Sequence, residues 1–413
     1  MAFATIGISF LFRPLGAFLA GHFGDKLGRR VVLIITLIAM GAATALIGFL
    51  PTYESPGILA PTPLIALRIV QGISAGGEWG GAVLLAVEHA DKRSRALHGS
   101  FPQIGVSIGL LLSSGVLALM TSIAPGDAFL EWGWRVPFFL SIALVFVGYW
   151  IRRGVEESPV FQEIAERKEQ VSNPLGKLIK GHWLLLVLAS VIFMANNAAG
   201  YMTTGGYIQN YATDPAGPIG LERGPVLWAV ATSAVSWLVF TIIAGAVSDK
   251  IGRRNTYILG WALLLIGIFS LFPLVNTGSA GMLLLGLVVL TVGLGFTYGQ
   301  QPAMYAELFP SSVRFSGVSV SYAIGSILGG AFAPTIPKAL VSSTRTTTSV
   351  AVYLGIVAVL SLTATLLLRD RTGIPLGPDH EDEQSVSPII GVGSPQVISD
   401  DVMAATPITS DRI

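Results

Sequence analysis

The sequence is short of charged residues and contains no cysteine. Asp, Glu, Lys and Arg make up 12% of its 413 residues, about half the share of a soluble globular domain. So few charges cannot cover the surface of a water-soluble protein of this size. The missing cysteines exclude a disulfide scaffold, a thiolate metal site and a cysteine nucleophile. The net charge of +1 gives no support for binding to nucleic acid.

Long apolar runs make up much of the sequence. Hydrophobic residues make up 52% of the chain, and the mean hydropathy is +0.69. A bilayer core about 30 Å thick is crossed by about 20 apolar residues, and helices satisfy their own backbone hydrogen bonds there. We predict an all-α integral membrane protein with eleven transmembrane helices, because a β-barrel would show short alternating segments instead. The expected spans are 3–23, 31–50, 64–87, 100–121, 135–152, 183–208, 225–247, 255–274, 280–300, 313–338 and 349–368.

Lys and Arg gather in alternate loops between these spans. The other loops contribute only Arg223 and Arg345. Basic loops stay on the cytoplasmic side of a membrane. The pattern therefore predicts a multi-pass protein of the inner (plasma) membrane with a cytoplasmic C-terminus.

A long charged loop divides five predicted spans from six. We expect an N-terminal helical bundle over 1–152, a cytoplasmic linker over 153–182 and a C-terminal bundle over 183–370. Residues 371–413 contain prolines, an acidic run and scattered Ser and Thr. Such a segment buries too little apolar surface to fold alone, so we predict a disordered cytoplasmic tail.

One basic loop occurs twice along the chain. The two copies are Gly21-His-Phe-Gly-Asp25-Lys26-Leu-Gly28-Arg29-Arg30 and Gly245-Ala-Val-Ser-Asp249-Lys250-Ile-Gly252-Arg253-Arg254. A weaker echo pairs Gly105 and Gly109 with Gly325 and Gly329. Glycines at such positions let helices pack closely. Parallel repeats are typical of secondary transporters, whose solute site lies between the two halves.

The doubled Asp-Lys-x-Gly-Arg-Arg loop resembles the hallmark of the major facilitator superfamily. Further stretches resemble the metabolite:proton symporter family, which includes carriers of proline and betaine, 2-oxoglutarate, citrate and shikimate. These stretches are 68–81, 132–138, 157–161 and 306–317. The resemblance runs from residue 1 to about 370 in the expected order. It implies two helical bundles that rock around a midplane solute site, with the proton as coupling ion.

The resemblance also implies that one helix is missing. The superfamily has twelve helices, and its basic loop follows the second, whereas here the loop follows the first predicted span. Either the gene start is placed too far downstream, or the chain is an eleven-span variant that does not transport. We favour the misplaced start, since Met1 is followed directly by apolar sequence.

Ionisable residues inside the predicted spans are candidates for the solute and proton pathway, because each costs about 2.5 kcal/mol or more in lipid. Arg68, Gln71 and Glu78 share one helix face at 100° per residue. We predict a polar cavity wall in which Arg13 or Arg68 meets an anionic group and Glu78 titrates. A buried ion network that only holds helices together is the alternative.

The second half contributes one unusually polar span. Asn197 and Tyr201 lie on it, and we expect both to face the solute pathway. A belt of tyrosines at the membrane interface would explain part of the same pattern.

The basic loops are expected to form a cytoplasmic gate. The resemblance implies that their Asp and Arg side chains cap and pair with neighbouring helix ends, whereas the simpler alternative is positive charge kept inside. The expected gate residues are Gly21, Asp25, Lys26, Gly28, Arg29 and Arg30 in the first copy, Asp249, Lys250, Gly252, Arg253 and Arg254 in the second, and Glu307 and Arg314 near the same face.

These observations predict a secondary active transporter for an organic acid or zwitterion, working by proton symport and alternating access. Its partners are the solute, protons and the lipid bilayer, without nucleic acid or ATP, since no phosphate-binding loop occurs. We predict neither a cofactor nor enzymatic activity, because no metal or acid–base constellation emerges. A facilitator or sugar-porter-like carrier, or a truncated non-transporting membrane protein, remains the alternative. The oligomeric state is open, and a monomer suits the sequence.

Overall fold

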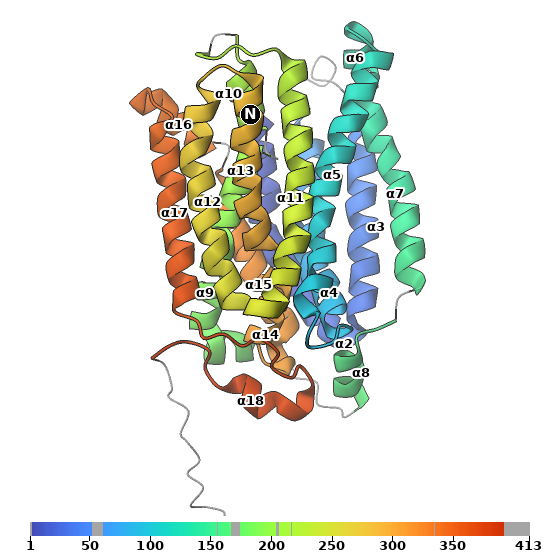
Figure 1. The fold of residues 1–413 in the computed structure, drawn as a ribbon. Helices are drawn as coiled ribbons and strands as arrows, with labels where there is room; N and C mark the ends of the chain where they lie inside the picture. The colour runs from blue at the N-terminus through green and yellow to red at the C-terminus, as the bar shows by residue number, and fades with distance from the viewer. Residues whose placement is uncertain are drawn as a thin grey trace, which may run out of the picture.

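Long helices run side by side in the computed structural model of the chain (Figure 1). The structure describes residues 2–51, 61–154, 156–166, 174–203, 206–215, 217–333 and 335–391. Within these ranges every regular element is helical, apart from one isolated bridge between Leu368 and Ile389. The predicted all-α class is confirmed.

The described helices are taken in two groups that follow one another along the chain, called the first and the second half. The first half contains α1 (Ala2–Leu11), α2 (Arg13–Leu27), α3 (Arg29–Ile47), α4 (Pro61–Glu88), α5 (Arg95–Ile123), α6 (Asp127–Glu131), the short η2 (Gly133–Arg135) and α7 (Val136–Gly154). A connecting helix, α8 (Pro159–Glu166), follows.

The second half begins within the predicted linker. It contains α9 (Pro174–Thr203), α10 (Tyr207–Thr213), α11 (Arg223–Ile251), α12 (Arg253–Val275), α13 (Ala280–Tyr298), α14 (Gln301–Leu308), η3 (Ser311–Val313), α15 (Arg314–Ser326), the π-helix η4 (Ile327–Ala331), α16 (Thr335–Thr344) and α17 (Thr348–Leu366). The short η5 (Pro378–His380) and α18 (Glu381–Ser385) come last. The halves meet where α2 packs on α15 and α5 packs on α11.

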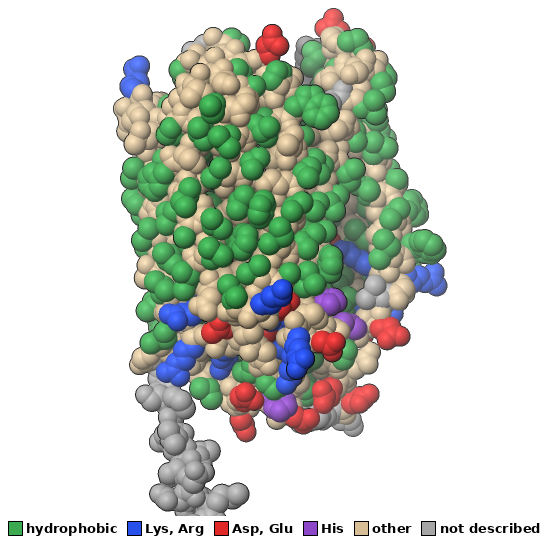
Figure 2. All heavy atoms as spheres, in the orientation of Figure 1, with side chains coloured by type: hydrophobic (Ala, Val, Ile, Leu, Met, Phe, Trp, Pro, Cys, Tyr) green, Lys and Arg blue, Asp and Glu red, His purple; other side chains and the backbone are tan. Residues whose placement is uncertain are grey.

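The surface suits a lipid environment. Figure 2 shows hydrophobic side chains over the middle of the face in view and charged side chains gathered at its lower end. By length and composition, nine helical segments of the described ranges qualify as membrane spans. The predicted spans 3–23 and 64–87 are not among the nine. The first is divided into α1 and α2, and the second is α4, which contains Arg68 and Glu78.

The break between α1 and α2 follows from one proline. Pro14 is the second residue of α2, and Phe12 precedes that helix. Proline has no N–H to donate, and its ring clashes with the carbonyl four residues earlier, here that of Phe10. The hydrogen-bond ladder is therefore interrupted beside Arg13.

The two basic loops turn in the same way. Gly28 separates α2 from α3 with φ +94°, and Gly252 separates α11 from α12 with φ +91°. Glycine adopts this left-handed backbone without strain. A Cβ at either position would also collide with a carboxylate, that of Glu157 or Asp370.

Two expectations about the predicted loops need correction. The region predicted as the linker loop, 153–182, contains α8 and the first turns of α9, which kinks at His182 (φ −134°). Residues 371–391, predicted as disordered, fold against the bundle through η5 and α18. The remainder of the predicted tail, 392–413, lies outside the described residues.

Candidate functional site

Arg68 and Gln71 form a polar chain with the neighbouring helix, as their shared face predicted. The Arg68 guanidinium donates to Gln71 Oε1 (3.1 Å), and Gln71 Nε2 donates to the Thr44 hydroxyl of α3 (2.8 Å). Gln71 is buried, and Arg68 is partly buried. The amide therefore holds the guanidinium in place without neutralising its charge.

Arg13 lies at the α1–α2 break, over an aromatic ring. Its guanidinium carbon is 3.9 Å from the centroid of the Phe10 ring, a distance typical of cation–π contacts. The Phe10 ring meets the Tyr201 ring edge to face, with centroids 5.2 Å apart. Tyr201 lies near both Arg13 and Arg68. The structure thus brings together three residues predicted from separate parts of the sequence.

Asn197 belongs to the same region. Its amide donates to the Ser326 carbonyl (2.9 Å), where α15 passes into the π-helix η4. A Cβ at Gly330 would meet both Asn197 Nδ2 and the Phe10 ring. Asn197 therefore lies where the second half touches α1.

Glu78 takes a different position from the one expected. It pairs with Arg152 near the end of α7, and both side chains are partly exposed. Its described partner is thus a cation of its own half, rather than Arg68 or Arg13. The predicted titrating role of Glu78 stays a prediction.

The sequence analysis missed an aromatic stack between the halves. Trp79 lies flat on Tyr322 (centroids 3.9 Å apart, 6° between planes), and Tyr322 stacks in turn on Phe193 at 4.4 Å. Trp79 Nε1 donates to Gln103 Oε1 (2.8 Å), and Gln103 Nε2 donates to the Tyr298 carbonyl (3.1 Å). Helical periodicity places Trp79 on its own helix but cannot name the partners that face it.

The second basic loop joins α11 to α12 at the lower end of the bundle (Figure 1), the basic end, and forms a buried ion network there. Arg253 donates to both oxygens of Glu307 (2.9 and 3.1 Å) and to Asp249 (2.7 Å). Asp249 also accepts the backbone N–H groups of Ala96 and Leu97 (3.0 and 2.9 Å). It thereby caps the N-terminus of α5, which belongs to the other half.

The first basic loop repeats this arrangement. Arg29 pairs with Glu88 and donates to the Ser158 hydroxyl (3.3 Å). Arg314, at the start of α15, lies 3.5 Å from Glu88. Its counterpart Arg95, at the start of α5, lies 3.4 Å from Glu307. Each half therefore sends one arginine to the buried glutamate of the other.

Glu88 and Arg95 had not been predicted as gate residues, although the sequence contains a pattern that indicates them. Both Glu88 with Arg95 and Glu307 with Arg314 have the spacing Glu-x6-Arg at the end of one helix and the start of the next. The repeat seen in the basic loops extends to this pair.

The other predicted gate residues flank these networks. The backbone N–H of Arg30 donates to Glu157 (3.0 Å), and that of Arg254 to Asp370 (3.3 Å). Gly21 packs against Ser316 of α15, and Lys250 is exposed. The side chains of Asp25 and Lys26 lie outside the described part of the chain.

A C-terminal strap, residues 369–391, closes over the basic end. Arg314 donates to the Leu376 carbonyl (2.8 Å) and to Gln384 Oε1 (2.9 Å), and Arg95 donates to the Ile374 carbonyl (2.6 Å). The strap therefore contacts cations that lie at the start of one helix in each half. The polar composition of this segment predicted disorder. Composition alone does not reveal that backbone carbonyls of the segment accept hydrogen bonds from buried arginines.

Glu381 anchors the strap. Its carboxylate accepts hydrogen bonds from Ser311 and Ser312 and lies 3.4 Å from the Lys177 ammonium. Burial by itself would raise the pKa of Glu381, but these hydrogen bonds and the Lys177 charge outweigh it and lower the pKa.

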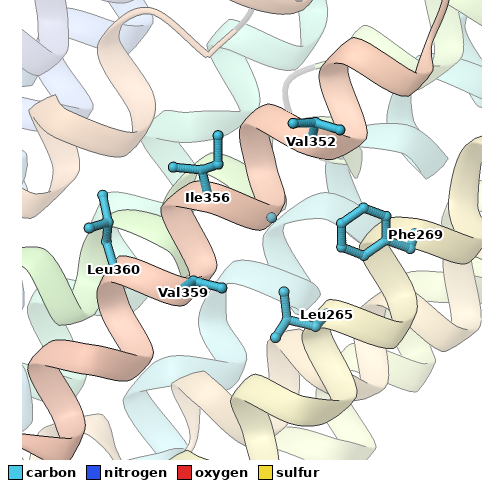
Figure 3. Close-up of a pocket in the computed structure, with 7 residues that line it drawn as sticks. Leu265, Phe269, Val352, Ile356, Val359 and Leu360 are labelled. Atoms are coloured by element: carbon cyan, nitrogen blue, oxygen red, sulfur yellow. The ribbon is translucent and has the colours of Figure 1, made fainter.

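An apolar groove on the outer surface is not part of this site. It has a volume of about 310 Å³ and is lined by side chains of α12 and α17, including Leu265, Phe269 and Ile356 (Figure 3). With no polar group in its lining, it suits lipid contact. Among the described residues, no cluster of His, Asp and Glu could hold a metal ion.

Comparisons with known proteins agree with this geometry. The profile of the Major Facilitator Superfamily matches residues 2–334 and 219–406. The Inner membrane metabolite transport protein YhjE of Escherichia coli K12 is 40% identical over 89% of this chain and 83% of its own. The Shikimate transporter of the same organism is 37% identical over 89% of this chain and 84% of its own.

Two further matches have lower sequence identity. The Proline/betaine transporter of Salmonella typhimurium is 31% identical over 94% of this chain and 79% of its own. The solved structure of the proton:xylose symporter XylE matches with a TM-score of 0.68 and 20% identity, over 89% of this chain and 86% of that one. At this identity the likeness concerns the fold.

Proposed function

The chain belongs to the major facilitator superfamily and is a multi-pass membrane transporter of metabolites, and from this premise we propose that it is a proton symporter for a carboxylate-bearing solute. The solute is either an organic acid or a zwitterion. The named substrates of its relatives, shikimate and proline or betaine, support this class.

The observation that carries the proposal is the pair Arg13 and Arg68. Both side chains are partly buried, and neither forms an ion pair with a carboxylate of the described residues. The Nε of each is buried without a hydrogen-bond partner. A cation enclosed in this way is stabilised by an anionic group, and a solute carboxylate supplies one.

We place the basic end in the cytoplasm, following the distribution of Lys and Arg. The two ion networks and the strap then close the cytoplasmic side. Release of a solute to the cytoplasm requires the pairs Arg95–Glu307 and Arg314–Glu88 to separate, since these join the halves. Proton coupling has support from the solved proton:xylose symporter of the same fold, and Glu78 is its candidate carrier.

Uptake into right-side-out vesicles tests the proposal. Labelled organic acids, proline and betaine are offered with an imposed inward proton gradient, to this chain and to a form extended upstream. We expect gradient-driven accumulation of at least one solute. Accumulation without dependence on the gradient would favour the facilitator alternative.

Substitutions separate the site from the fold. We expect Arg68→Gln and Arg13→Gln each to lower uptake at low solute concentration about tenfold or more, the effect of losing one charged hydrogen bond. Arg93→Gln, at an exposed position of the basic end, is the matched control and leaves uptake unchanged. Equal uptake by all three variants would contradict the assignment of the two arginines.

A further inference from the structure

A second polar cavity lies at the end of the second half opposite the basic end. It has a volume of about 380 Å³ and is formed between α10, the loop that follows it and α16. Small-molecule sites have volumes of about 300–1,000 Å³. Tyr207, Tyr211, Asp214 and Lys338 line it, together with Asn210 and Ser342.

Two tyrosines give the cavity a fixed aromatic wall. The rings of Tyr207 and Tyr211 are stacked, with centroids 6.2 Å apart and 9° between planes. The Tyr211 hydroxyl donates to Asn276 Oδ1 (2.8 Å), and Asn276 Nδ2 donates to Thr347 (3.0 Å). The Phe272 ring meets the Tyr211 ring edge to face. These contacts from α12 and α17 hold the wall in place before any ligand binds.

The cavity lining contains two side chains of opposite charge. Lys338 comes from α16 and Asp214 from the loop after α10, and both are exposed. An ammonium group is attracted by tyrosine faces and by a carboxylate, whereas a carboxylate is attracted by the lysine. Because the two charges come to the lining from different segments, we propose that this cavity is a loading site for a zwitterion, with the ammonium of the ligand against Tyr207, Tyr211 and Asp214 and its carboxylate at Lys338.

The proposal rests on the proposed function and narrows its solute class from carboxylates in general to zwitterions. Tyr201 lies near the end of α9, and α10 with Tyr207 follows it directly. Tyr201, a residue that the second half contributes to the interior site around Arg13, and the loading site thus lie on consecutive helices.

Single cysteines test the site directly, because the chain has none of its own. Ser342→Cys places a thiol in the cavity lining, and Ser343→Cys places one at the next, exposed position of the same helix, outside the lining. The purified protein is labelled with a maleimide in the presence of glycine betaine, choline or acetate. We expect glycine betaine to slow labelling at Ser342→Cys severalfold and to leave Ser343→Cys unaffected.

Further variants assign the two charges. In the Ser342→Cys background, Lys338→Gln is expected to remove the advantage of glycine betaine over choline, and Tyr211→Leu to remove most protection by either. Arg345→Gln, an exposed cation outside the lining, is the matched control. Equal protection of both cysteines, protection by acetate alone, or no protection by glycine betaine would overturn the proposal.

A phospholipid headgroup carries the same two charges, so one arm offers a short-chain phosphatidylethanolamine. Protection by this lipid and not by glycine betaine would identify a lipid site and overturn the solute assignment. The labelling needs no transport. If vesicles show no uptake but glycine betaine protects Ser342→Cys, the proposed function fails while the loading site stands. If vesicles show uptake but glycine betaine does not protect Ser342→Cys, the loading site is wrong while the proposed function stands.

Discussion

The two halves place equivalent glycines in opposite surroundings. In the second half a Cβ at Gly325 would lie 2.6 Å from the Ser190 carbonyl, and one at Gly329 would lie 2.1 Å from that of Met194. Both carbonyls belong to α9. At the equivalent positions of α5, Gly105 and Gly109, a Cβ would meet no atom of the described residues within 4 Å. The same repeat element is thus covered in one half and open in the other.

The helices beside these glycines show the same difference. The apolar stretch of α17, which packs on α9, is 50% buried, whereas that of α7 is 0% buried. In the second half α15 packs on α9, whereas within residues 2–154 the described elements that pack on α5 are α4, α7 and η2. The comparison teaches that a glycine repeat in sequence marks a place for close packing but does not guarantee a neighbour.

The largest expected effect compares the two buried glutamates. Glu307→Gln removes the negative charge that Arg253 and Arg95 share and replaces one of its two acceptor oxygens by an amide donor. Breaking a buried ion pair costs about 3–5 kcal/mol. We expect a loss in this range, read as a lowered unfolding temperature of the purified protein.

Glu88→Gln is the counterpart in the first half and is expected to cost less, since Arg314 keeps its four described hydrogen bonds to carbonyls and Gln384. Glu131→Gln, at an exposed position, is the control. Equal losses for the two buried glutamates would show that the networks are energetically equivalent despite their different partners.

The next effect is steric. Gly329→Leu forces a side chain into the α9 backbone, and overpacking of this kind costs about 1–3 kcal/mol or more. Gly109→Leu meets open space and is expected to leave stability unchanged. The yield of monodisperse protein in detergent distinguishes the two variants.

An extended chain sharpens the glycine comparison. If a form extended upstream supplies the helix that the family resemblance implies, Gly109→Leu becomes harmful in that form only. Tolerance in both forms would contradict the expectation that such a helix packs on α5.

The smallest effect concerns the strap. The loop at Ser311 and Ser312 is covered by Glu381, whereas the equivalent loop of the first half, 91–94, is largely exposed. Because the folded-state pKa of Glu381 is lowered, its contribution to docking is complete above the ordinary carboxyl pKa of about 4.5 and is lost as the pH falls through the lower folded value.

Hydrogen exchange of residues 371–391, corrected for the intrinsic rate, checks this pH dependence. Protection is expected to decrease at acidic pH, and Glu381→Gln is expected to reduce protection already at pH 7. Exchange that is independent of both the pH and this substitution would contradict the anchoring role of Glu381.

Much of the fold follows from the sequence, because lipid requires long apolar helices and the basic loops recur. The sequence also singled out Arg13, Arg68, Gln71, Asn197 and Tyr201, since polar groups are rare in such helices. It did not reveal the Glu78–Arg152 pair or the Trp79–Tyr322 stack, because helical periodicity says which residues share a face and not which helix lies opposite. The sequence did not predict the folded strap for a similar reason. Its carbonyl and amide oxygens accept hydrogen bonds from Arg95 and Arg314, and the sequence does not show that these arginines lie next to it.

Asp249 interacts with both halves, and this affects how the halves separate. Its contacts to Ala96 and Leu97 cross between the halves, while its partner Arg253 stays within its own half together with Glu307. If the halves separate, the Asp249 carboxylate loses its hydrogen bonds from the backbone N–H groups of Ala96 and Leu97. It keeps its ion pair with Arg253. At this contact the second half therefore keeps its own ion pair, whereas Arg95 and Arg314 each give up a carboxylate of the other half.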